Sequence, residues 1–150
     1  LTFIKEWLLP RLRALSVDPV IDDFGNIWAD VPMPSLEYGP SFIWSCHVDT
    51  VHKPSCTRQA VVWDTDGRTL KLAKRKAGRC LGADDGAGVW LLLRMIGARV
   101  PGRYVFHRGE EVGRLGSIWV RDNTPEKLKG FDAVVAFDRR EYVDLITHQM

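Results

Sequence analysis

Three short runs of apolar residues, separated by segments of helical character, constrain the fold of this chain more than any other feature. The runs cover residues 42–44, 104–106 and 133–137. Near-continuous apolar runs are typical of strands that are buried on both faces of a sheet. A Leu-rich helical segment over 86–99 separates the first two runs, and a shorter one over 116–121 lies between the last two. Strands that alternate with helices predict an α/β fold with an open, mostly parallel mixed sheet and helices on both sides, in three layers.

The remaining segments add local elements before and between these strands. Residues 2–15 have apolar side chains at helical spacing, and Pro10 must kink this amphipathic helix or begin a new turn. A first hairpin is predicted over 20–28, because Gly25 and Asn26 in its turn permit positive φ. A second hairpin is predicted over 60–72, around the turn at 64–67.

Composition excludes several classes of protein. A length of 150 residues suits one domain, and the net charge of +2 is too small for binding to nucleic acid or a membrane surface by bulk electrostatics. No apolar run approaches the roughly 18 residues that a membrane span needs. The N-terminus lacks the basic start of a secretory signal, and three cysteines without metal-site spacing suggest reduced thiols, so we expect a cytoplasmic protein. The basic run from Lys71 to Arg79 is more typical of a solvated hairpin and loop than of a nucleic-acid site.

Acidic and imidazole side chains follow each of the three predicted strands. In an open α/β sheet the carboxyl ends of the strands line one crevice, where ligands bind. A further pair of acids stands directly before the long helix. Four separate segments should therefore deliver their side chains to one place: His47 and Asp49, Asp84 and Asp85, Glu110 and Glu111, and Asp138.

Such a cluster calls for a positive partner, because carboxylates that share a crevice repel one another. Divalent metal ions are the simplest partner. One imidazole with several carboxylates and no thiolate suits zinc, manganese or cobalt in a hydrolytic site, and the carboxylates suffice for two ions with a shared ligand. Each motif alone also has an ordinary structural interpretation. In the segment 82–88, for example, Asp84 or Asp85 could cap a helix.

Taken together, the motifs resemble those of the di-zinc exopeptidase family, which includes tripeptidase, aminopeptidase and acyl-amino-acid hydrolase branches. The resemblance runs from Phe24 to Asp138. It rests on four segments: Ser45-Cys46-His47-Val48-Asp49-Thr50-Val51, Leu81-Gly82-Ala83-Asp84-Asp85-Gly86-Ala87-Gly88, Gly109-Glu110-Glu111-Val112-Gly113 and Ala136-Phe137-Asp138.

The resemblance implies a role for each matching residue. His47 and Asp138 would ligate one zinc ion, Glu111 would ligate the second, and Asp84 would bridge the two. A cis peptide bond between Asp84 and Asp85 would fit the family. Asp49 would fix the imidazole tautomer of His47, and Glu110 would act as the general base. Adjacent side chains of an extended segment point apart, so Glu110 and Glu111 can fill both roles only if the backbone turns there, which Gly109 and Gly113 permit.

One feature of the family does not match. Its members have a further metal-ligating His after an inserted domain, and only residues 139–150 follow Asp138. We therefore expect residues 1–150 to form a single catalytic domain that is incomplete at its C-terminus, with a loosely held second ion. His148 is more typical of an ordinary strand or surface histidine than of a substitute ligand.

The function that these features favour is metal-dependent hydrolysis of amide bonds in short peptides, by an exopeptidase with two Zn²⁺ ions, or with Co²⁺ or Mn²⁺. Two alternatives stay open at this point. The chain could be a catalytically silent metal-binding fragment of such an enzyme, or a deacylase of N-acyl amino acids on the same fold. The sequence does not decide between a monomer and a homo-oligomer.

Overall fold

The computed structural model describes residues 2–33, 41–51, 60–73, 80–139 and 146–147. Two helical pieces begin the chain, a series of strands follows, and from residue 83 onward helices alternate with strands up to the last strand. In chain order the elements are η1 (Phe3–Leu8), α1 (Leu9–Ala14), β1 (Val20–Ile21), β2 (Ile27–Val31), β3 (Phe42–His47), β4 (Val61–Trp63), β5 (Leu70–Leu72), α2 (Ala83–Gly97), β6 (Gly102–His107), α3 (Leu115–Asn123), η3 (Pro125–Leu128) and β7 (Ala133–Ala136).

The main sheet has five strands in the order β1-β2-β6-β3-β7. β3 pairs parallel with both β6 and β7, while β2 pairs antiparallel with β6 and with β1. In the register His47 lies opposite His107, and Ser45 lies opposite Ala136. The three parallel strands therefore end at nearly the same level, and the segments that follow them share one edge. The predicted α/β fold with a mostly parallel mixed sheet is confirmed.

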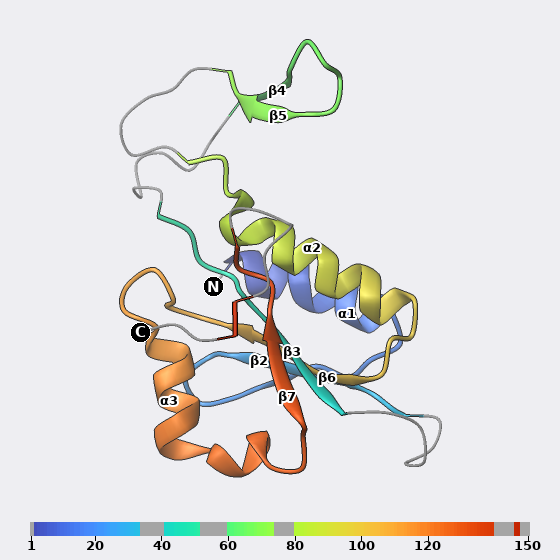
Figure 1. Cartoon of the computed structure of the whole chain (residues 1–150), viewed down its shortest axis with the longest axis vertical. Coiled ribbons are helices and arrows are strands. Elements are labelled where there is room, and N and C mark those ends of the chain that lie inside the picture. Colours follow the sequence, from blue (N-terminus) through green and yellow to red (C-terminus); the bar gives the residue numbers. More distant parts are fainter. Residues whose placement is uncertain (1, 34–40, 52–59, 74–79, 140–145, 148–150) are drawn as a thin grey trace.

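Helices cover both faces of this sheet (Figure 1). On one face, η1, α1 and α2 bury Leu8, Leu12 and Leu92 against side chains of β2 and β6 such as Tyr104 and Phe106. On the other face, α3 contributes Val120 to a smaller cluster with strand residues: Trp28, Ile43 and Val105. Alternate residues of β6 thus supply the two cores, as the two-residue period of a strand requires. The arrangement has three layers.

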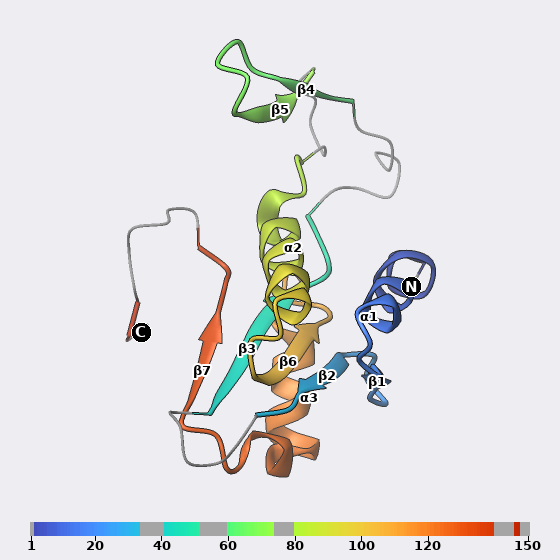
Figure 2. The ribbon, with the colours of Figure 1, turned by 90° about the vertical axis from the view of Figure 1, so that its right-hand side faces the viewer.

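Both predicted hairpins are confirmed. β1 pairs with β2 through the register Val20–Trp28, and this hairpin joins the main sheet. β4 and β5 form a separate two-stranded sheet, which lies away from the main sheet beyond the N-terminal end of α2 (Figure 2). The three residues of β4, Val61, Val62 and Trp63, are exposed.

The N-terminal segment divides where Pro10 predicts. A π-helical stretch ends at Leu8, and Pro10 stands in the first turn of the α-helix that follows. Thr124 and Pro125 begin η3, which is a 3-10 helix, and the Thr124 side chain makes no capping hydrogen bond.

Among the described helices, none has the length and apolar character needed to cross a membrane. Cys46 and Cys80 are in no disulfide within the described segments.

Candidate metal and catalytic site

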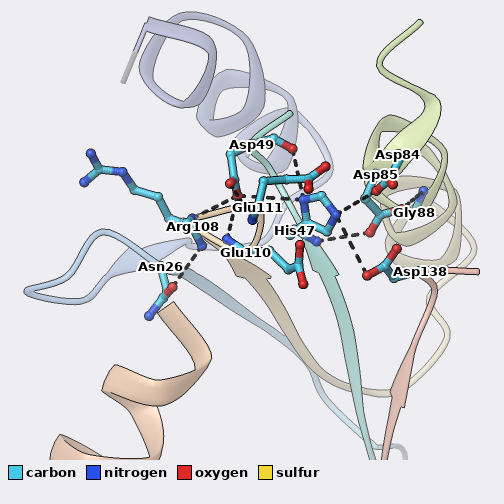
Figure 3. A network of polar contacts seen from close by, with 11 residues as sticks. Asn26, His47, Asp49, Asp84, Asp85, Gly88, Arg108, Glu110, Glu111 and Asp138 are labelled. Carbon is cyan, nitrogen blue, oxygen red and sulfur yellow. Dashed lines mark hydrogen bonds and ion pairs between the residues drawn. The ribbon is translucent and has the colours of Figure 1, made fainter. Parts of the chain in front are cut away.

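The imidazole of His47 lies at the centre of the polar cluster (Figure 3). It ends β3 and is 3% exposed. Its Nδ1 donates to the backbone carbonyl oxygen of Asp49 at 3.0 Å, because a carbonyl oxygen only accepts. Nε2 faces the carboxylates of Asp84 and Asp138, at 2.9 and 3.9 Å. Since Nδ1 holds the hydrogen of the neutral ring, Nε2 is the ring atom available to a metal ion.

Asp84 and Asp85 take different positions at the start of α2. Both have non-helical backbone angles, and the peptide bond between them is cis, as the resemblance implies. The Asp84 side chain is 71% exposed and lies against His47. Asp85 is 3% exposed, and its carboxylate accepts the N–H groups of Gly88 at 2.9 Å and His47 at 3.1 Å. Asp85 therefore caps the first regular turn of α2 and ties it to the end of β3.

The glutamate pair stands on a tight turn between β6 and α3. Gly109 and Gly113 have φ of 76° and 107°, in the left-handed region that glycine favours. The carbonyl oxygen of Glu110 accepts the N–H groups of Gly113 and Arg114, at 3.0 and 2.8 Å. The turn brings both glutamates to His47: one carboxylate oxygen of Glu110, one of Glu111 and one ring nitrogen of His47 lie within 4.8 Å of one another.

The side chain of Asp49 binds the backbone of this turn. Its carboxylate accepts the backbone N–H groups of Gly109 at 2.8 Å, Glu110 at 3.1 Å and Glu111 at 3.1 Å. Its Oδ1 atom is 3.7 Å from Nδ1 of His47, whose hydrogen bond goes to the Asp49 carbonyl instead. The single residue Asp49 thus orients the imidazole through its backbone and the glutamate turn through its side chain.

The electrostatics of the cluster reflect its excess of acids. Burial disfavours the charged form of His47, but the hydrogen bond to Asp84 and the nearby carboxylates of Asp85, Asp138 and Asp49 outweigh it and raise the pKa of the imidazole. Burial raises the pKa of Asp85 to about 6. Partial burial and the neighbouring Asp84 carboxylate raise the pKa of Glu111. Each shift lowers the local negative charge, as expected for acids that share one site.

A cavity of about 270 Å³ opens beside the cluster. His47, Glu110 and Asp138 line it. The other lining residues are Ser45, Cys46, His107, Val134 and Ala136 from the strands, and Arg114 and Ser117 at the N-terminal end of α3. Burial lowers the pKa of His107 to about 4, so this ring is neutral at physiological pH. The cavity gives a small ligand access to Glu110 and to the residues around His47.

The donor set fits a divalent metal ion. His47, Asp84 and Asp138 each offer one ligand atom, and these atoms lie within 4.8 Å of one another. Imidazole nitrogen and carboxylate oxygen are ligands that zinc, manganese and cobalt accept. No lysine or arginine is among the ion-pair partners of these acids in the described segments. These three residues could therefore hold a divalent metal ion.

The sequence-predicted residues His47, Asp84, Glu110, Glu111 and Asp138 all meet in this cluster, while His148 lies outside the described residues. Residues 74–79, which hold most of the basic run, also lie outside them. Sequence reasoning missed Asn26, whose buried carboxamide bonds to both flanks of the glutamate turn. The Gly-Asn pair was a turn signal in the sequence, but its partners are 82 and 90 residues away and left no local trace.

Comparison with known proteins supports the fold. No protein-family model and no curated protein matches the sequence. Among solved structures, the chain is similar to a tripeptidase from Staphylococcus aureus, with 24% sequence identity and a TM-score of 0.68. The match covers 91% of this chain and 37% of the tripeptidase chain, so this chain spans little more than a third of the length of that protein. The fold is therefore peptidase-like.

Proposed function

We propose that this chain is a metal-dependent hydrolase that cleaves amide bonds of short peptides as an exopeptidase, or the catalytic part of one. The observation that carries the proposal is the meeting of His47, Asp84, Asp138 and the Glu110–Glu111 pair at the ends of the parallel strands and the start of α2. The similarity to the tripeptidase fold supports the same reaction class. We further propose membership of the di-zinc exopeptidase family and a single catalytic domain over residues 1–150.

His47, Asp84 and Asp138 are the proposed ligands of the first ion, and they form one of the two groups of candidate donors. Asp84 and Glu111 would hold the second ion, as the family resemblance implies; the structure groups Glu111 with His47 and Glu110. Zn²⁺ is the proposed metal, with Co²⁺ or Mn²⁺ as substitutes. When bound, such ions act as Lewis acids that polarise a carbonyl and lower the pKa of water.

Glu110 is the proposed general base. Its side chain lines the cavity next to His47 and Asp138, and the glutamate turn keeps it beside Glu111. A carboxylate in this place can accept the proton of the attacking water and pass it to the leaving nitrogen. The cavity volume of about 270 Å³ suits a small substrate such as a short peptide or an N-acyl amino acid. We propose that the protein acts in the cytoplasm, without nucleic-acid or membrane partners.

A reconstitution experiment tests this proposal. The purified chain is loaded with zinc or cobalt, its metal content is measured, and turnover is assayed on dipeptides, tripeptides, aminoacyl amides and N-acyl amino acids. Glu110→Gln should lower kcat by about 10²-fold to 10⁴-fold and leave the metal content nearly unchanged. Absence of stoichiometric metal, together with equal activity of Glu110→Gln and wild type, would overturn the proposal. Metal binding without turnover would instead favour a silent metal-binding fragment. Activity confined to N-acyl amino acids would favour a deacylase.

A further inference from the structure

Asn26 is fully buried and connects the first hairpin to a loop that lies 82 to 90 residues later in the sequence. It stands in the turn between β1 and β2 and is 0% exposed. Its Oδ1 accepts the backbone N–H of Arg108 at 3.1 Å, and its Nδ2 donates to the carbonyl oxygen of Gly116 at 3.2 Å. Nδ2 also donates to Oδ2 of Asp22 at 2.9 Å. One carboxamide therefore makes three hydrogen bonds, two of them to distant backbone.

The two backbone partners of Asn26 stand on either side of the glutamate turn. Arg108 directly follows β6, Gly116 lies in the first turn of α3, and Glu110 and Glu111 lie between them. Asp49 already holds the middle of this segment through three backbone N–H groups. Asn26 bonds to the two ends of the segment, and the Leu115 N–H, which donates to the carbonyl oxygen of Gly109 at 2.8 Å, joins these ends as well. Figure 3 shows Asn26 bonded to Arg108 beside the glutamates.

The orientation of the Asn26 carboxamide is set by Asp22. Oδ1 of Asp22 accepts the backbone N–H groups of Gly25 and Asn26, both at 2.9 Å, and its Oδ2 accepts from Trp28 Nε1 at 3.0 Å. Because a carboxylate only accepts, the amide nitrogen of Asn26 must face Asp22. The amide oxygen then points to the N–H of Arg108.

The Asn26 carboxamide packs closely against Gly116. A Cβ atom on Gly116 would overlap Oδ1 of Asn26 and the carbonyl oxygen of Arg108. The position therefore requires a side chain with one donor group and one acceptor group of this length, opposite a residue without a side chain. Asp lacks the donor, and Leu lacks both groups.

We propose that Asn26 is a positioning residue for the glutamate pair, and that it sets the reach of Glu110 and Glu111 toward His47 by closing the loop that carries them. The inference rests on the proposed function for the roles of these glutamates. Asn26 itself does not line the cavity and lies in neither group of candidate metal ligands. It acts only through residues 108–116.

The test compares two variants of the same hairpin. Asn26→Asp keeps the size of the side chain and the acceptor for Arg108, but it removes the donor to both Gly116 and Asp22 and places a second carboxylate beside Asp22. Trp28→Phe removes the bond from Trp28 Nε1 to Asp22 and packing from the core, but leaves both Asn26 bonds to the loop in place. Both variants should unfold at a lower temperature than wild type. Amide hydrogen exchange over residues 108–116, zinc titration, and kcat and KM on a dipeptide are then measured for each.

Asn26→Asp should speed exchange of the Gly109, Glu110 and Glu111 amides, weaken zinc binding by about tenfold to a hundredfold, and lower kcat by a similar factor with little change in KM. Trp28→Phe should leave amide exchange in this loop, zinc affinity and kcat near the wild-type values. The inference fails if Asn26→Asp keeps wild-type exchange in this loop, or if Trp28→Phe changes it equally. Gly116→Ala, which disturbs the same contact from the other side, gives the answer if Asn26→Asp does not fold. If wild type binds no zinc or shows no turnover, the proposed function fails, while loop exchange still decides the positioning role.

Discussion

At the scale of single residues, Asp49 connects two parts of the candidate site, the imidazole of His47 and the glutamate turn. Its backbone oxygen accepts from Nδ1 of His47, and its carboxylate accepts three N–H groups of the glutamate turn. A carboxylate can do this because all its lone pairs accept, and hydrogen bonds to an ionised acceptor are stronger than neutral ones. Asp49 therefore couples the position of the imidazole to that of Glu110 and Glu111.

Asp49→Asn should weaken metal binding without unfolding the protein. The amide keeps one acceptor oxygen for Gly109 and Glu110, but its nitrogen would face the N–H of Glu111, which is donor against donor. Loss of such a supporting contact typically lowers metal affinity by about 10-fold to 100-fold, and isothermal titration with zinc measures the change. Asp132→Asn serves as control, because Asp132 accepts from Ser41 at the other end of the sheet. Zinc affinity equal to wild type in Asp49→Asn would contradict this coupling.

Asp22 should contribute to stability in a pH-dependent way. Burial opposes the charged form of Asp22, but hydrogen bonds from Trp28, Asn26 and Gly25 outweigh it and lower its pKa below the ordinary value of 3.8. A lowered folded pKa means that the contribution is present above the unfolded pKa and is lost as pH falls through the folded pKa.

Urea unfolding of wild type and Asp22→Asn at two pH values measures this contribution. Asp22→Asn should lower the free energy of unfolding by about 1–2 kcal/mol near neutral pH, since the four donors to this carboxylate lose an ionised acceptor. The gap between the variants should narrow as pH falls below 3.8, where the wild-type carboxyl takes up its proton. If the difference in unfolding free energy between the two proteins stays constant into strong acid, the destabilisation comes from packing and not from the charge of Asp22.

At the scale of elements, local patterns carry most of the fold. The apolar runs predict β3, β6 and β7, and the turn residues predict both hairpins, because strand burial and turn chemistry are properties of neighbouring residues. Strands β3 and β6 extend further than their apolar runs, whereas β7 ends one residue before its run does. β3 continues through Ser45 and Cys46 to His47, because these residues pair with β6.

The sequence did not predict which strands pair with one another in the sheet. Nothing local indicates that the first hairpin joins the main sheet with β2 antiparallel to β6, since strand order depends on long-range pairing. The same limit hid the contact of Asn26 with Arg108 and Gly116. The site residues were easier to predict, because chemistry at the end of a buried strand shows in the sequence beside the strand itself.

Helix α2 offers a matched test of close packing next to the site. A Cβ atom on Gly88 would overlap the carboxylate of Asp85 and the carbonyl oxygen of Phe137, whereas one on Gly86 would meet nothing within 4 Å. Gly88→Ala should therefore lower the free energy of unfolding by about 1–3 kcal/mol through overpacking. Gly86→Ala should raise it by about 0.5–1 kcal/mol, because Ala favours the helix more than Gly does. Chemical denaturation measures both, and a Gly88→Ala variant as stable as Gly86→Ala would show that the helix can shift without loss.

At the scale of the whole molecule, the net charge of +2 conceals an uneven distribution. The acids of the candidate site come from the start of α2 and from the segments that follow β3, β6 and β7, and folding brings them to one edge of the sheet. Their mutual repulsion opposes folding, and a cation bound there would remove it. Because the unfolded chain does not bring these groups together, binding of the ion to the native state alone should stabilise the fold.

Zinc should therefore raise the unfolding temperature of the whole chain, and one carboxylate-to-amide change should show where it acts. At a free zinc concentration of about 100 times Kd, linkage gives about 2.7 kcal/mol of added stability, or about 5–10 °C for a chain of this size. Asp84→Asn removes one carboxylate from the cluster and should lose most of this shift. Asp64→Asn makes the same chemical change in the β4–β5 hairpin, where Asp64 pairs with Lys71, and should keep it. Thermal unfolding with zinc and with a chelator measures all three proteins. An equal zinc shift in both variants would mean that the ion binds elsewhere, because only one of the two changes alters the residues around His47.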